Sequence, residues 1–153
     1  MSALLKDVLT PDQIAKSHAS MGLDTQLLDD GTYFLLYDGA ALVGCGGWSR
    51  RRTLFGGNHS AGRDNAFADP KTEPAKIRAM YTHPDHTRRG IGRKLLELGE
   101  VAARSEGFQA IELGATASGI LLYKKCGYVV IDDISETDED GVSVPNILMR
   151  KDL

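Results

Sequence analysis

Hydrophobic residues recur at helical spacing in the middle of the chain, between Gly90 and Glu106. Apolar side chains that lie three or four positions apart share one face of a helix. The positions that follow this spacing are Ile91, Leu95, Leu98 and Ala102. Gly107 comes directly after them, where a glycine commonly ends a helix. The segment therefore predicts an amphipathic helix.

Two further helical segments are predicted nearer the start of the chain. Residues 10–22 begin with Thr10, which can cap a helix, and Pro11, which suits the first helical position. Gly22 can end this helix. Residues 25–31 predict an additional helical turn.

Three strands are predicted before the central helix. Residues 32–49 favour two strands joined by a tight turn at Asp38-Gly39. The three glycines within residues 44–47 indicate a bulge or a close backbone contact. Residues 75–83 predict the third strand, and Pro84 closes it because proline cannot continue a hydrogen-bonded ladder.

The segments after the central helix alternate between strand and helix patterns. Residues 108–113 predict a strand, and residues 118–126 predict a helix that Ser118 can cap and Gly127 can end. Residues 128–132 predict the next strand.

The last part of the chain predicts a turn and one more strand. Residues 136–141 are acidic and favour a solvated turn. Residues 142–150 predict the final strand, in which Pro145 indicates an edge position or a bulge.

The order of these elements predicts an α/β (α+β) fold built around one mixed sheet. The strand–helix–strand unit of residues 76–113 should form a right-handed crossover. The chain has 153 residues, which predicts one domain over residues 1–153.

Composition narrows the function classes. The formal net charge is −3, whereas a nucleic-acid-binding protein is more often basic, so we expect no nucleic-acid partner. Cys45 and Cys126 are too few for a disulfide framework, and neither lies in a metal-binding spacing. We therefore expect no metal. The sequence shows no signal peptide and no membrane-spanning segment, so we expect a cytoplasmic protein with no membrane partner.

Residues 50–74 show no period and predict a long irregular loop. Trp48 and the arginines of residues 50–52 come at its start and could bind an anionic or aromatic ligand. A solvated loop or a subunit contact is the alternative interpretation, and it is nearly as well supported.

The stretch TRRGIGR, residues 87–93, has the components of a phosphate-binding turn. The first amides of a helix lack helical partners and favour an anion, and glycines allow its close approach. Arginines at 88, 89 and 93 add cationic donors. A Walker loop and a dinucleotide fingerprint are both excluded, because neither GK[ST] nor GxGxxG occurs here. A glycine-rich loop with solvated arginines remains the alternative for this stretch taken alone.

In its wider context the chain resembles the GCN5-related N-acetyltransferase family from about Thr32 onward. The family signature Q/R-x-x-G-x-G/A follows a strand and a proline and opens a long helix. This chain supplies Pro84 and the glycines, then Tyr123 in the second helix and Gly127-Tyr128 after it. Thr87 departs from the first signature position.

The resemblance implies a central, mostly antiparallel mixed sheet flanked by helices, with acetyl-CoA as co-substrate and no metal. It implies that the turn binds the pyrophosphate of acetyl-CoA and that the pantetheine arm lies beside the strand of residues 79–83. Ser118 replaces a frequent family asparagine and could offer a hydrogen bond. The implied cofactor-binding residues are Met80, Tyr81, Thr82, Arg88, Arg89, Gly90, Ile91, Gly92, Arg93, Ser118 and Tyr123.

The resemblance also implies roles in catalysis. Tyr123 would be the general acid toward the departing thiolate, and a backbone N–H on the strand ending at Thr82 would meet the oxyanion. The general base is unassigned, because the family's glutamate position corresponds to Lys76. The alternatives for the proton acceptor are Glu112, His83, Tyr81, Glu73 or a water relay.

The preferred hypothesis is therefore direct acetyl transfer from acetyl-CoA to an amine. The alternative is a non-catalytic acyl-CoA-binding or sensing domain of the same fold; O-acetylation and a longer acyl donor are weaker options. The acceptor is a small-molecule or protein amine, and a homodimer is possible at the level of the family.

Overall fold

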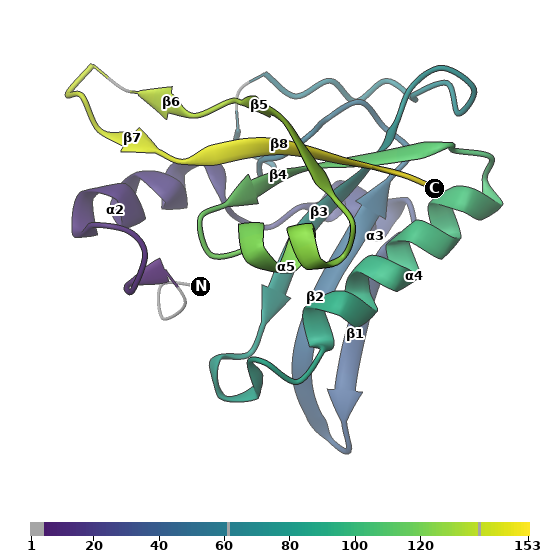
Figure 1. Cartoon of the computed structure of the whole chain (residues 1–153), viewed down its shortest axis with the longest axis horizontal. Helices are drawn as coiled ribbons and strands as arrows, with labels where there is room; N and C mark the ends of the chain where they lie inside the picture. The colour runs from purple at the N-terminus through teal and green to yellow at the C-terminus, as the bar shows by residue number, and fades with distance from the viewer. Residues whose placement is uncertain (1–4, 61, 138) are drawn as a thin grey trace.

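The structure is a computed structural model that describes residues 5–60, 62–137 and 139–153. Across these residues a six-stranded mixed sheet runs in the order β1-β2-β3-β4-β8-β5, as Figure 1 shows. Its strands are β1 (Tyr33–Asp38), β2 (Ala41–Ser49), β3 (Ala75–Thr82), β4 (Ala110–Thr116), β5 (Val129–Asp133) and β8 (Asn146–Asp152). The helices are α2 (Pro11–Ser20), α3 (Thr25–Asp29), the 3-10 turn η1 (Pro84–His86), α4 (Ile91–Ser105) and α5 (Ile120–Lys125). The predicted α/β class and the element order are confirmed.

The cap predicted at the first long helix is present. Thr10 Oγ1 accepts from Gln13 N at 3.3 Å, and Gln13 Oε1 accepts from Thr10 N at 3.0 Å. Two backbone amides at the start of α2 are thereby satisfied, and Pro11 occupies the first helical position. The helix ends at Ser20, two residues before the predicted Gly22.

The glycine run of β2 has the meaning predicted from the sequence. The pairing of β2 with β3 is irregular between Cys45 and Gly47. A Cβ on Gly46 would lie 2.6 Å from Met80 Sδ and 3.3 Å from its Cα, so only glycine lets the bulged part of β3 approach. Ala79, in this part of β3, has a φ of 52°.

The two strands that flank the centre of the sheet separate after a short contact. β3 pairs with β4 in parallel only at Ala75↔Ile111 and Lys76↔Glu112. β4 then pairs with β8 along its whole length, while β3 stays paired with β2. The edge of β3 that faces β4 is therefore open beyond Lys76.

Side chains alternate between the two faces of the sheet at this opening. Ile77 packs toward α4, since a Cβ on Gly99 would lie 2.6 Å from Ile77 Cδ1, and the core on this face includes Leu96, Leu113 and Tyr123. Arg78 points to the opposite face, where it meets Asp24 at the start of α3 and Gly56 of the long loop.

The C-terminal region departs from the prediction in two ways. The predicted last strand is divided at Pro145 into β7 (Ser143–Val144), which pairs with β6 (Glu136–Thr137), and β8. β8 lies inside the sheet between β4 and β5, so the predicted edge position is wrong; Pro145 precedes the strand and removes no ladder hydrogen bond from it.

The predicted cap of the short helix is also wrong. Gly119 is the N-cap residue of α5, and no side chain caps it. Ser118 Oγ instead lies 3.3 Å from Thr116 Oγ1. The predicted ends of α4 and α5 are confirmed, because Gly107 and Gly127 follow with φ values of 91° and 92°.

Candidate active site

The turn into α4 presents unpaired backbone donors. Gly90 is the N-cap residue with a φ of 82°, and no side chain caps the helix. The first intrahelical bond runs from Lys94 N to Gly90 O, so the amides of residues 91–93 have no helical acceptor. Arg88 also has a positive φ, of 64°, which is unfavourable for a residue with a Cβ. The free amides of this turn and the helix dipole are together suited to bind an anion.

The two glycines of the turn serve different purposes. A Cβ on Gly90 would meet nothing within 4 Å, so the space in front of the helix is open and the positive φ is what requires glycine. A Cβ on Gly92 would lie 2.6 Å from Leu122 Cδ2. Gly92 therefore allows α5 to pack against the first turn of α4, rather than clearing the approach of a ligand.

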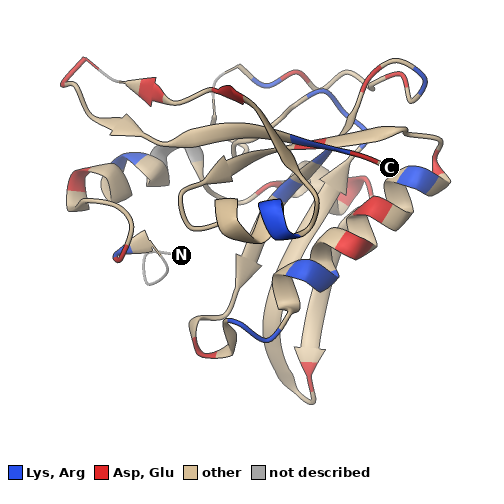
Figure 2. Cartoon of the chain, in the orientation of Figure 1, with Lys and Arg blue, Asp and Glu red and all other residues tan. Residues whose placement is uncertain are grey.

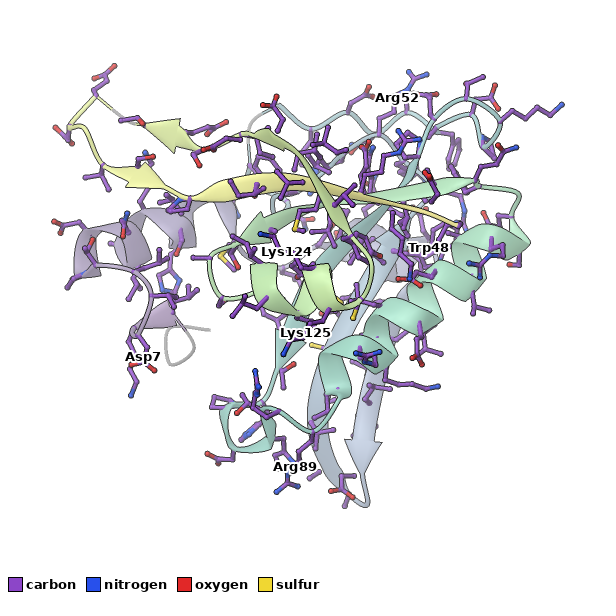
Figure 3. All side chains as sticks on the ribbon, in the orientation of Figure 1. Asp7, Trp48, Arg52, Arg89, Lys124 and Lys125 are labelled. Atoms are coloured by element: carbon purple, nitrogen blue, oxygen red, sulfur yellow. The ribbon has the colours of Figure 1, made fainter. Side chains whose placement is uncertain are left out.

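Cationic side chains surround the turn. Figure 2 shows Lys and Arg on the segment that leads into α4 and on its first turns. Arg88, Arg89 and Arg93 are all exposed. Arg89 is 4.0 Å from Asp38 Oδ2 and lies at the end of the molecule away from Arg52, as Figure 3 shows. These cations can add to the attraction that the backbone donors provide for phosphate.

The open edge of β3 leads from this turn into the sheet. Met80, Tyr81 and Thr82 are half-buried on the part of β3 that no longer pairs with β4. Tyr33 Oη donates to the carbonyl of Ala79 at 3.2 Å, which holds the bulge in place. Backbone groups on this edge can pair with an extended ligand.

A cavity of about 150 Å³ lies where β3 and β4 separate. Its lining includes residues from both faces of the sheet. Ile77, Leu113 and Tyr123 come from the face covered by α4 and α5. Asp24 and Arg78 come from the opposite face. The cavity therefore connects the two sides of the sheet through the gap between the strands.

Tyr123 of α5 is one of two tyrosines that line this cavity, the other being Tyr81 of β3. The Tyr123 side chain is buried against the core, and its ring makes an edge contact with Tyr128 at 6.1 Å between centroids. A Cβ on Gly119 would lie 2.5 Å from the Tyr123 ring, so glycine is needed where α5 begins. Burial raises the pKa of Tyr123 to about 12, so the hydroxyl keeps its proton at neutral pH and can donate it to a hydrogen bond.

The side chains considered as general base are placed apart from this hydroxyl. Glu112 Oε2 accepts from Lys76 Nζ at 2.7 Å. Glu73 binds Arg52, and the hydrogen bond from Arg52 lowers the pKa of that carboxyl to about 2. His83 caps η1 by accepting from Asp85 N at 3.3 Å. Glu112, Glu73 and His83 do not line the cavity, whereas Tyr81 does, and burial raises the pKa of Tyr81.

The long loop does not present its arginines as predicted. Arg50 binds Glu106 at 2.7 Å, Arg51 binds Asp30 at 2.7 Å, and Arg52 binds Glu73 at 2.7 Å. Trp48 is buried and makes an edge contact with Phe108 at 6.0 Å between ring centroids. These cations are neutralised within the protein, and the indole is enclosed in the core. Trp48 and these three arginines are therefore not available to a ligand, whereas residues 54–57 of the same loop line the cavity.

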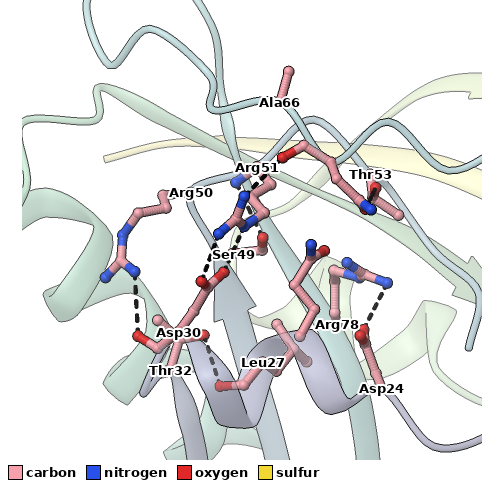
Figure 4. Close-up of polar contacts among 12 residues, drawn as sticks. Asp24, Leu27, Asp30, Thr32, Ser49, Arg50, Arg51, Thr53, Ala66 and Arg78 are labelled. Carbon is pink, nitrogen blue, oxygen red and sulfur yellow. Dashed lines mark hydrogen bonds and ion pairs between the residues drawn. The ribbon is translucent and has the colours of Figure 1, made fainter. Parts of the chain in front are cut away.

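A buried charge cluster of Asp24, Arg63 and Arg78, of which the sequence did not single out Asp24 and Arg78, lies on the face of the sheet opposite α4. Arg78 Nη2 lies 2.6 Å from Asp24 Oδ2 and donates to the carbonyl of Gly56 at 2.8 Å, as the close-up in Figure 4 shows for the ion pair. Arg63 Nη2 lies 3.1 Å from Asp24 Oδ1. Asp24 precedes a short helical pattern, and the only local signal it carries is that of an N-cap residue.

Two structural absences apply to the described residues alone. No group of His, Cys, Asp or Glu among them is arranged to hold a metal ion. No helix formed by them is both long and apolar enough to cross a membrane.

The profile of the Acetyltransferase (GNAT) family matches residues 2–128, and the chain belongs to this family. Members of the family are acyl- and acetyltransferases. A search of curated protein sequences returned no significant match.

Solved structures of family members share the fold. A GCN5-related N-acetyltransferase from Rhodopseudomonas palustris is 18% identical with a TM-score of 0.64, over 98% of this chain and 81% of the other. A putative acetyltransferase from Salmonella typhimurium, solved with its cofactor acetyl-CoA, is 22% identical with a TM-score of 0.60, over 95% and 75%. A ribosomal-protein-alanine N-acetyltransferase from Brucella melitensis is 17% identical with a TM-score of 0.61, over 84% and 73%. The mixed sheet flanked by helices is the fold of these neighbours.

Proposed function

We propose that the protein is an acetyl-CoA-dependent N-acetyltransferase that moves an acetyl group directly to an amine. The observation that carries this proposal is the continuity of three features. Free amides at the start of α4 lead to the open edge of β3, and that edge leads to a cavity lined by the buried Tyr123. A domain that only bound acyl-CoA would need the first two features but not an opening to the other face of the sheet.

The donor would bind on the α4 side. The amides of residues 91–93, with Arg88 and Arg93, are suited to its diphosphate. The pantetheine arm would pair with backbone groups near Met80 and Thr82 as an added strand. The neighbour solved with acetyl-CoA supports the choice of acetyl-CoA as donor at the level of the shared fold.

The amine would approach from the opposite face. Its nitrogen attacks the thioester carbon, while a backbone N–H of β3 near the bulge stabilises the developing oxyanion. The Tyr123 hydroxyl hydrogen-bonds the leaving sulfur, which departs as the thiol of coenzyme A. The proton that the amine loses goes to water at the mouth of the cavity.

A covalent relay through cysteine has no support in the geometry. Neither Cys45 nor Cys126 lines the cavity. Burial raises the pKa of the Cys126 thiol, which disfavours the thiolate that a nucleophile requires. Direct transfer in a ternary complex is therefore the mechanism we infer.

The test combines binding and turnover. Acetyl-CoA should raise the melting temperature, because a ligand that binds only the folded state stabilises it. Release of free thiol over a panel of amines should then detect transfer. Stabilisation without turnover on any amine would favour the non-catalytic alternative, and the absence of stabilisation would contradict both.

A further inference from the structure

Within the described part of the chain, three buried side-chain atoms have neither a hydrogen-bond partner nor an ion pair, and all belong to residues that line the same cavity. They are Arg78 Nε, Arg78 Nη1 and Asn146 Oδ1. Buried polar groups in proteins are nearly always hydrogen-bonded, so exceptions call for an explanation. Their grouping at one cavity indicates a polar ligand with both acceptor and donor groups.

The charges of Asp24, Arg63 and Arg78 indicate the sign of the charge that the ligand carries. Arg63 and Arg78 share the single carboxylate of Asp24, and the three side chains are 11%, 1% and 3% exposed. Two cations against one anion leave one positive charge uncompensated in a buried place, which is unfavourable. Burial, with a smaller contribution from Arg63, lowers the pKa of Arg78 to about 10. A ligand that carries one negative charge would neutralise the cluster.

The shape of the guanidinium favours a carboxylate. Two of its three nitrogens, Nε and Nη1, have no partner, and guanidinium donors match the oxygens of a planar carboxylate. On β8, Asn146 Oδ1 can accept a hydrogen bond from an amine. The cavity thus provides donors for a carboxylate and an acceptor for an amine.

The distance along β3 limits the size of the ligand. Arg78 precedes Met80 by two positions, which is at most about 7 Å along the strand because the bulged Ala79 lies between them. The acetyl group is expected near Met80 under the proposed function. A ligand that spans these two points has only a few bonds between its carboxylate and its amine.

We propose that the acceptor is a small amino acid, whose carboxylate binds Arg78 while its amine lies near Asn146 and receives the acetyl group. This inference rests on the proposed function. A nitrogen–carbon bond forms and the carbon–sulfur bond breaks. Tyr123 assists departure of the thiol and recovers its proton from solvent, which takes up the proton released by the amine. Because the three unpartnered atoms are closed off from solvent, binding requires Arg78 or the loop at Gly56 to adjust.

The first experiment compares matched amines on the wild-type protein. L-Alanine, β-alanine and γ-aminobutyrate are each tested against the corresponding carboxamide, and γ-aminobutyrate is also tested against n-butylamine. Only the acid can form a charged hydrogen-bonded pair with Arg78. We therefore expect the kcat/KM of the acid to exceed that of its amide by about tenfold or more for at least one of the three amino acids. Equal rates for acids and amides would overturn the inference.

A binding measurement separates this inference from the proposed function. The melting temperature is recorded with acetyl-CoA alone, with each acid alone and with each amide alone. If acetyl-CoA gives no stabilisation, the proposed function fails, and with it the role of the amino acid as acetyl acceptor; the acids and amides then still decide whether the cavity binds an amino acid. Stabilisation by the acids but not the amides supports it, and no difference between them overturns it.

Variants of Arg78 test whether this residue causes the preference for acids over amides. Arg78→Gln should remove the preference for acids over amides, whereas Arg104→Gln, an exposed arginine of α4, should keep it. Arg78→Lys retains the charge and should retain part of the preference even if Arg78→Gln is poorly folded. Preservation of the full preference in folded Arg78→Gln would overturn the inference, as would tighter binding of aminomethylphosphonate than of the carboxylates.

Discussion

Lys76 Nζ lies 2.7 Å from Glu112 Oε2 at the last pair of residues where β3 and β4 run side by side. The two side chains are 10% and 14% exposed, so the ion pair is largely buried at the point where the sheet opens. The lysine occupies the position where some family members have a glutamate, and here its role is to hold the adjacent strand through Glu112.

Substitution of Glu112 tests this role directly. Glu112→Gln leaves the Lys76 ammonium without its charged partner and should lower the free energy of unfolding by ~1–3 kcal/mol. Turnover should change by less than about threefold, because Glu112 does not line the cavity. Loss of a general base would instead lower the rate by a factor on the order of 10²–10⁴. Thermal denaturation and free-thiol release measure the two effects. A loss of turnover of about a hundredfold in a folded variant is what removal of a general base would cause, and it would assign that role to Glu112.

The turn of residues 87–93 yields a second prediction. Gly90→Val places a β-branched residue at a φ of 82° and fills the open space before α4, so the affinity for coenzyme A should fall by about tenfold or more. Gly39→Val is the matched control, because Gly39 has a φ of 59° and open space in the β1–β2 turn. Titration calorimetry should show nearly normal affinity for the control despite its lowered stability. Similar affinity losses in both variants would mean that strain alone causes the effect.

Tyr123 gives a third prediction. Tyr123→Phe keeps the packing against Tyr128 and removes the hydroxyl, so kcat should fall by about ten- to a hundredfold. The affinity for acetyl-CoA should stay within about twofold, because the diphosphate contacts lie at α4. Tyr128→Phe is the control; it loses the hydrogen bond to Glu100 Oε1 at 3.0 Å and should affect stability more than turnover. Parallel losses of kcat and affinity in Tyr123→Phe would indicate a structural role.

The pKa of Tyr123 also predicts how stability depends on alkaline pH. Burial raises this pKa from 10.0 to about 12, so the folded state holds the phenolic proton more tightly than the unfolded state does. The stabilisation is fully present below pH 10 and is lost as the pH rises toward 12. Melting temperatures measured between pH 8 and pH 11 should therefore fall less steeply for Tyr123→Phe than for the wild type. Identical slopes would show that Tyr123 titrates equally in both states.

Local patterns were sufficient for most of the elements. The helical spacing after Gly90, the glycines that follow α4 and α5, and the proline after β3 each act within a few residues of the chain. The cap at Thr10 is a local hydrogen bond of the same kind. Such signals depend on backbone geometry and neighbouring side chains, which the sequence specifies directly.

The signals failed where a partner came from far along the chain. The cations that follow Trp48 look available in sequence, yet each finds a carboxylate from a distant segment. Pro145 indicated an edge, but only the pairing of β8 with both β4 and β5 places that strand inside the sheet.

The sequence by itself determined the glycine turn of residues 87–93, the helix that follows it and the position of Tyr123 in α5. Glycine conformation, helix periodicity and a family motif are all properties of short stretches of the chain. The tertiary structure alone brought Asp24, Arg78 and Asn146 to one cavity, since these residues lie on separate elements and have no spacing that links them. It also decided that β3 and β4 part after Lys76, because the pairing of strands depends on contacts between distant segments, which no local pattern records.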